Sequence, residues 1–68
     1  MKATSGKRFC QIVEAHGWSL DRVRGSHHIF IQPGNPIILT VPVQGNRDLK
    51  RGTLGKLIKD SGIDESEL

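Results

Sequence analysis

Aromatic and sulfur-containing side chains are scarce in this 68-residue sequence, and long apolar runs are absent. It has no tyrosine, only Phe9, Trp18 and Phe30 as large aromatic residues, and a single cysteine, Cys10. One cysteine excludes an intramolecular disulfide and a thiolate metal framework. No apolar run is longer than the three residues 37–39, which is far too short to span a bilayer. We therefore expect an unexported, cytoplasmic protein with no cofactor, no membrane partner and no deep small-molecule pocket.

Basic side chains outnumber acidic ones, and their distribution is uneven. The chain has ten Lys and Arg, seven Asp and Glu, and a formal net charge of +3. Three of the acids, Asp64, Glu65 and Glu67, lie in the last five residues, so the remainder carries +6. This positive field favours a polyanionic partner, although Lys and Arg that only solvate helix faces give the same composition. We expect one domain over residues 1–68, with residues 64–68 as a frayed tail.

Two helices are predicted from apolar residues that recur every three or four positions. The first covers residues 5–16, begins with a hydroxyl side chain that can cap its free amides, and ends at Gly17. The second begins at Thr53, whose hydroxyl we expect to be its cap, and ends at Gly62. Cys10 adjoins the first stripe, which favours a buried thiol. The two apolar stripes consist of Phe9, Ile12 and Val13, and of Leu54, Leu57 and Ile58.

Three strands are predicted between the helices, over residues 18–24, 27–32 and 37–43, with turn-forming residues between them. In the middle strand, period-two alternation places every second side chain on the same face. Two isoleucines mark the face of residues 27, 29 and 31 as core-facing, so we expect His28 and Phe30 to point outward. The fold class is then α+β with the order αβββα, in which an antiparallel three-stranded sheet carries both helices on one face.

An outward imidazole on a rigid strand is the predicted centre of the chemistry. His28 beside Arg22 and Arg24 can exchange a proton near neutral pH next to a phosphodiester, and RNA supplies its own nucleophile, the 2′-hydroxyl. Adjacent His27 and His28 point to opposite faces, which disfavours a shared metal ion, so we predict no metal site. For Ser26 a tight turn is the simpler interpretation.

The candidate RNA contacts are basic residues near this strand and at the start of the second helix. That helix terminus presents free N–H groups and a positive dipole end, which suit a phosphate. Ser26, His27 and Phe30 are candidate supports of the catalytic histidine, with His27 bracing the strand or a neighbouring loop. The predicted RNA contacts are Arg22, Arg24, Arg47, Lys50, Arg51 and Thr53.

The segments GSHHIF, ILTVPVQ and LKRGTLGKLIKDSGI, in this order, resemble the HicA toxins of toxin-antitoxin pairs. The resemblance implies a fold similar to the double-stranded-RNA-binding domain and a type II toxin that acts as a metal-independent mRNA endoribonuclease. It also implies neutralisation by a cognate HicB-like antitoxin. In the family motif the second histidine of GSHH is catalytic, which corresponds to His28 as general base. Many members read VPVH where this chain has Gln44, a departure that bears on any two-histidine mechanism.

Two other functions fit the same residues. A non-catalytic RNA-binding module would use the same basic face and recognise its ligand by shape. A small DNA-binding regulator is the weaker alternative, because no helix-turn-helix pattern is evident. Cleavage of RNA in the presence of EDTA separates the nuclease from the binder.

Overall fold

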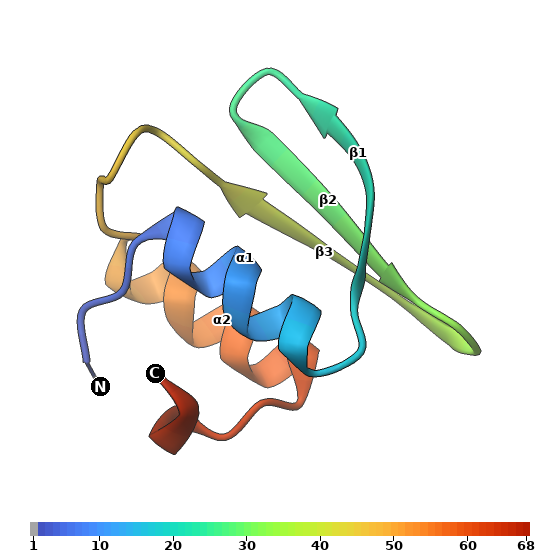
Figure 1. Ribbon diagram of the computed structural model, residues 1–68. Helices are drawn as coiled ribbons and strands as arrows, with labels where there is room; N and C mark the ends of the chain where they lie inside the picture. Colours follow the sequence, from blue (N-terminus) through green and yellow to red (C-terminus); the bar gives the residue numbers. More distant parts are fainter. Residues whose placement is uncertain (1) are drawn as a thin grey trace.

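The computed structural model describes residues 2–68 as an α+β fold. Its elements in chain order are α1 (Gly6–Ala15), β1 (Ser19–Arg24), β2 (His27–Gln32), β3 (Asn35–Pro42), α2 (Arg51–Ser61) and a 3-10 turn, η1 (Glu65–Glu67) (Figure 1). The strands form one antiparallel sheet in the order β1-β2-β3. Figure 1 shows the two helices side by side against the same face of this sheet. The predicted αβββα architecture is therefore confirmed.

Helix α1 has the boundaries that its sequence predicts. The hydroxyl of Ser5 accepts a hydrogen bond from the backbone N–H of Arg8 at 3.0 Å, which satisfies one of the free amides of the first turn. At the other end Gly17 has φ of 92°, which a side chain would disfavour, and Trp18 folds back so that it is 3% exposed. The chain therefore turns sharply from α1 into β1.

Helix α2 begins two residues earlier than expected. Its N-cap is Lys50, whose side chain makes no capping hydrogen bond, and its first helical residue is Arg51. Thr53 thus lies inside the first turn, and the prediction that its hydroxyl caps the helix is wrong. The backbone N–H of Leu54 donates the first helical bond, to the carbonyl of Lys50 at 2.9 Å. The predicted C-terminus is confirmed, since Gly62 is left-handed with φ of 71°.

The hydrophobic core lies between the helices and the face of the sheet that they cover. Burial of each large apolar side chain in it contributes about 1.5–3 kcal/mol to folding. The helices contribute their predicted stripes, and the sheet contributes Phe30, Leu39 and Val41. The most deeply buried side chains, each less than 2% exposed, are Phe9, Phe30, Leu39, Val13 and Val41.

The middle strand faces the opposite way from the prediction. In the register, His28 pairs with Val41 and Phe30 with Leu39, and these partners are 0% and 1% exposed beneath the helices. Cross-strand partners share a face, so His28 and Phe30 point toward the helices, and the residues at 27, 29 and 31 point away. The expected outward direction of His28 and Phe30 is therefore wrong. Three consecutive apolar residues carry no period-two signal, and Phe30 buries more area than either isoleucine.

Residues 4–6 are joined to residues 47–49, a contact that we call the N-terminal bridge. The N–H of Leu49 donates to the carbonyl of Thr4 at 2.9 Å, and the N–H of Gly6 donates to the carbonyl of Arg47 at 3.4 Å. A Cβ added at Gly6 would clash with the carbonyl oxygen of Pro42, so the absence of a side chain allows α1 to approach the end of β3. The loop between β3 and α2 is held against α1 in this way.

The C-terminal residues form a turn against the body rather than the frayed tail expected. The carboxylate of Asp64 accepts a hydrogen bond from the N–H of Ser66 at 2.9 Å, which holds the pKa of Asp64 below its usual value. His16 Nε2 lies 3.1 Å from Glu67 Oε1, and Leu68 packs against the core. Within residues 2–68, no helix is both long and apolar enough to cross a membrane.

Candidate RNA-binding and catalytic site

His28 is half-buried near the start of β2, where its neighbours in the register are Val23 of β1 and Val41 of β3. Its Nδ1 atom is buried and has no hydrogen-bond partner among residues 2–68. Its Nε2 atom likewise makes no hydrogen bond to the described residues, but it is not among the enclosed atoms. The ring therefore has one nitrogen in the interior and one that reaches the surface.

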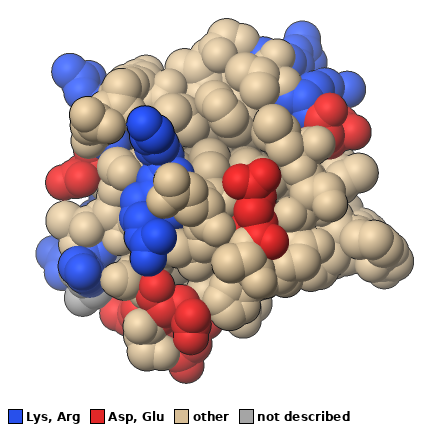
Figure 2. Space-filling view, in the orientation of Figure 1, with Lys and Arg blue, Asp and Glu red and all other residues tan. Residues whose placement is uncertain are grey.

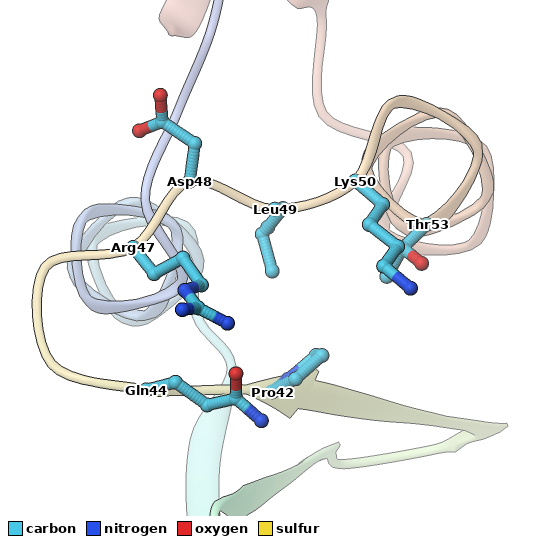
Figure 3. A pocket seen from close by; sticks show the side chains of 7 residues that line it. All are labelled: Pro42, Gln44, Arg47, Asp48, Leu49, Lys50 and Thr53. Atoms are coloured by element: carbon cyan, nitrogen blue, oxygen red, sulfur yellow. The ribbon is translucent and has the colours of Figure 1, made fainter.

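A shallow cavity of about 350 Å³ lies beside this position, between the end of β3, the following loop and the start of α2 (Figure 3). Val41, the cross-strand partner of His28, directly precedes Pro42 of the cavity wall, and Pro42 itself pairs with His27, so the backbone of both histidines lies close to the cavity. The cavity is lined by Pro42, Gln44, Arg47, Asp48, Leu49, Lys50 and Thr53.

The polar side chains of this cavity favour a negatively charged ligand. Figure 3 shows the guanidinium of Arg47 and the amide of Gln44 directed into the space, with the ammonium of Lys50 at its rim. The carboxylate of Asp48 points away from it. Two cations against one acid, whose carboxylate points away, create a positive local potential, and Arg can bind a phosphate through two parallel hydrogen bonds. The cavity is therefore suited to a phosphate group.

Three of the six predicted RNA contacts, Arg47, Lys50 and Thr53, line this cavity. Arg51 lies on the other side of Leu49, in a neighbouring hollow of about 240 Å³ that also includes Lys2. Pro42 and Leu49 complete the wall but carry no recognisable signal in the sequence. Pro42 and Leu49 lie on the same cavity wall because of the path of the loop between them, which the N-terminal bridge holds in place.

The remaining two predicted RNA contacts lie elsewhere. Arg22 and Arg24 are exposed on β1, where they pair with Ile29 and His27 on the face of the sheet opposite the helices. Neither arginine lines the cavity, and both lie on the face of the sheet opposite the one that His28 occupies. His27 itself is exposed on the same face as these arginines.

The three predicted supports of His28 have separate places. Phe30 is 1% exposed in the core and cannot contact a substrate. The carbonyl of Ser26 accepts a hydrogen bond from the N–H of Val43 at 2.6 Å, which joins the beginning of β2 to the end of β3. His27 faces away from His28. None of the three therefore orients the His28 ring through a hydrogen bond.

Figure 2 shows where charged side chains gather on the helix side of the molecule. Basic side chains cluster at the left of the view, where the amino-terminal ends of both helices lie, and a second group lies at the upper right, over β1. Acidic side chains gather at the bottom, around the C-terminal turn. The cationic surface is therefore divided into two parts, one at the cavity end and one at the outer strand.

Other reactive groups are not assembled into a site. Cys10 is 8% exposed in the core, and burial, reinforced by the charge of Glu14, raises the pKa of its thiol to about 11. A protonated, enclosed thiol is a poor nucleophile. Among residues 2–68, no three His, Cys, Asp or Glu side chains are grouped closely enough to hold a metal ion.

Comparison with known proteins assigns the chain to a family. The family model described as the HicA toxin of bacterial toxin-antitoxin systems matches residues 6–63, which include both helices and the whole sheet. No individual curated protein matches the chain. A toxin of this kind acts as half of a pair whose other member is an antitoxin. On this match, the chain belongs to the HicA toxin family and is the toxin component of a toxin-antitoxin pair.

Proposed function

We propose that this toxin is a metal-independent mRNA endoribonuclease in which His28 is the general base. The observations that carry the proposal concern His28: its Nδ1 is enclosed and its Nε2 is not, and its cross-strand partner Val41 directly precedes Pro42 of the cationic cavity. A base within reach of a ribose, next to groups that hold a phosphate, is what RNA cleavage requires. Membership of a toxin family supports an activity that harms the cell.

The proposed reaction is an internal transesterification. His28 Nε2 takes the proton of a ribose 2′-hydroxyl, the oxygen attacks the adjacent phosphorus, and the bond from phosphorus to the 5′-oxygen breaks. The departing oxygen takes a proton from water, and the products are a 2′,3′-cyclic phosphate and a 5′-hydroxyl. Arg47 and Lys50 stabilise the extra negative charge on the phosphate in the transition state.

The RNA contacts of this proposal are those at the cavity end: Arg47, Lys50, Arg51 and Thr53. The amide of Gln44 adds a hydrogen-bond donor and acceptor but cannot exchange protons at neutral pH, so the mechanism uses one histidine. Arg22 and Arg24 are left out, because they lie on the other face of the sheet. The toxin acts in the cytoplasm, and its partner is a HicB-like antitoxin in a type II pair.

One observation favours a second function, a non-catalytic RNA-binding module. The Nδ1 atom of His28 has no partner within residues 2–68, whereas a general base is usually oriented by a hydrogen bond to its second nitrogen. A binder would use the same cationic cavity without any proton transfer.

Incubation of purified protein with a labelled mRNA in excess EDTA tests the proposal. We expect cleavage that persists in EDTA, products with 2′,3′-cyclic phosphate ends, and no cleavage by His28→Ala. Cleaved ends with a free 3′-hydroxyl would contradict the transesterification. Intact RNA that only migrates more slowly in a native gel would establish the binding module instead.

A further inference from the structure

One polar side chain of the cavity has a chemistry that the proposed cleavage does not use: the carboxamide of Gln44. Figure 3 shows this group directed into the cavity, below the guanidinium of Arg47. Its nitrogen and oxygen make no hydrogen bond to any other group of residues 2–68. A carboxamide carries two donor hydrogens and an acceptor oxygen. Both kinds of hydrogen-bonding atom are therefore available to a ligand in the cavity.

The backbone on both sides of Gln44 is held by hydrogen bonds, which gives its side chain a defined origin. The N–H of Val43 donates to the carbonyl of Ser26 at 2.6 Å, and the N–H of Arg47 donates to the carbonyl of Gln44 at 3.1 Å. The second bond closes a four-residue turn in which Gly45 has φ of 60°. The first and last residues of such a turn are neighbours in space. The carboxamide and the guanidinium therefore enter the cavity from adjacent positions.

Part of the cavity wall is apolar. Pro42 and Leu49 are both half-buried, and Figure 3 shows the side chain of Leu49 directed toward Pro42. The volume of about 350 Å³ is more than a phosphate group fills and lies within the range typical of pockets for small organic groups, roughly 300–1,000 Å³. A phosphate gains nothing from an apolar wall, whereas a nucleobase has apolar ring faces and a polar edge. The cavity therefore suits a base beside the phosphate that Arg47 binds.

The carboxamide of Gln44 matches a base edge that carries a donor next to an acceptor. Glutamine pairs with adenine in this way, because Nε2 donates to N7 while Oε1 accepts from the amino group at N6. Adenine repeats the arrangement on its other edge, at N6 and N1. The N7 edge of guanine carries two acceptors, which match an arginine instead. Pyrimidines have no N7 edge and a smaller ring to cover the apolar wall, so adenine is the base that fits best.

We infer that Gln44 is a specificity-determining residue that selects adenine in single-stranded RNA, at the nucleotide next to the phosphate bound by Arg47. The inference rests on the proposed function, since it takes the cavity as the RNA site. Arg47 and Lys50 contribute affinity that is the same for every sequence, because phosphates carry no sequence information. Single-stranded RNA is required because only an unstacked base can present its edge inside a cavity.

Four short 2′-O-methyl RNAs test the inference through their affinity for the protein. Each consists of uridine except at the central nucleotide, which is A, C, G or U. The methyl group blocks the 2′-hydroxyl, so the RNA stays intact whether or not the protein is a nuclease. We expect the wild type to bind the adenine RNA about tenfold more tightly than the other three, which is the order of discrimination given by one bidentate contact. Gln44→Ala should bind all four nearly equally.

A second variant and a matched control sharpen the measurement. Gln44→Arg introduces a group that pairs with O6 and N7 of guanine, so its preference should move from adenine to guanine. The control, Gln11→Ala, removes the same kind of side chain from an exposed position of α1 that does not line the cavity, and it should keep the preference of the wild type. Because each preference is a ratio of affinities for one protein, partial loss of folding does not imitate the effect.

The possible results separate this inference from the proposed function. Equal wild-type affinity for the four RNAs, a wild-type preference for another base, or a preference for adenine that Gln44→Ala or Gln44→Arg retains would each overturn the inference and leave the RNA site in place. Absence of binding to all four RNAs would overturn both. A wild type that prefers adenine through Gln44 but leaves unmodified RNA uncut would support the inference and contradict the nuclease.

Discussion

Both faces of the sheet carry large apolar side chains and one histidine, but their surroundings differ. On the face that the helices cover, Phe30 and Leu39 are each 1% exposed, whereas on the opposite face Ile31 and Ile38 are 40% and 57% exposed and only Ile29, at 9%, is buried. His28 and His27, adjacent in the chain, are divided between these two faces in the same way. Apolar character therefore does not identify the inner face of a small sheet. The inner face is the one that the two helices cover.

Replacing each of the two histidines with alanine, one at a time, gives the largest expected contrast between the faces. His28→Ala should lower the rate of RNA cleavage by about 10²–10⁴-fold, the usual contribution of a general base. His27→Ala should retain at least a third of the wild-type rate, because this ring lies on the other face. Single-turnover assays with saturating protein provide the measurement. Equal losses in the two variants would contradict the assignment of the base to the covered face.

Truncation of neighbouring apolar residues tests the same contrast through stability. Phe30→Ala leaves a cavity in the core and should lower the free energy of unfolding by about 3–5 kcal/mol. Ile31→Ala, one residue further along β2, removes a side chain already in contact with water and should cost less than about 1 kcal/mol. Urea unfolding followed by the fluorescence of buried Trp18 reports both values. If Ile31→Ala were the more damaging change, the facing of β2 would be reversed.

Two glycines allow a comparison of packing at the helices. Gly6→Ala places a methyl group against the carbonyl of Pro42 and should destabilise the protein by about 1–3 kcal/mol. Gly55→Ala in α2 meets no atom within 4 Å and should stabilise the protein by about 0.5–1 kcal/mol, because alanine loses less backbone entropy. Thermal unfolding of both variants measures the difference. A tolerated Gly6→Ala would mean that α1 and β3 can separate at little cost.

The effect expected to be smallest at neutral pH concerns Cys10, because it appears only at high pH. The pKa of this thiol is raised in the folded state from its ordinary value of 9.0 to about 11, chiefly by burial. The folded state therefore keeps a proton that the unfolded chain loses. Its stabilising contribution is complete below pH 9 and disappears as pH rises through 11, a loss of about 2–3 kcal/mol. Cys10→Ala should lack this loss, so the difference between the unfolding free energies of the wild type and the variant should change between pH 9 and 11. Parallel curves of unfolding free energy against pH would contradict the prediction.

Local sequence signals were sufficient for the elements of the fold. Ser5 and Gly17 bound α1 because capping and a left-handed turn are properties of single residues. The limits of β2, His27–Gln32, follow from β-branched residues between two turns. Where several signals of this kind agree, little information from the rest of the chain is needed.

The predictions that proved wrong concern features of the fold that depend on residues far apart in the sequence. The facing of β2 depends on Leu39 and Val41, which belong to another strand, and on which side the helices cover. The start of α2 depends on a loop that is bonded to the amino-terminal segment. For the same reason the sequence grouped Arg22 and Arg24 with Arg47, although the fold places them on separate surfaces. Charge is visible in a sequence, but its grouping in space is not.

The N-terminal bridge has a consequence for the order in which the molecule forms and opens. It joins residues more than forty positions apart, whereas the two hairpins join neighbours, so it closes a much longer loop and carries a greater entropic cost. Its two hydrogen bonds are also few in number. The amide protons of Gly6 and Leu49 should therefore exchange with solvent deuterium well before that of Phe30. A brief local opening there releases the segment that bears Arg47 while the sheet and its register persist.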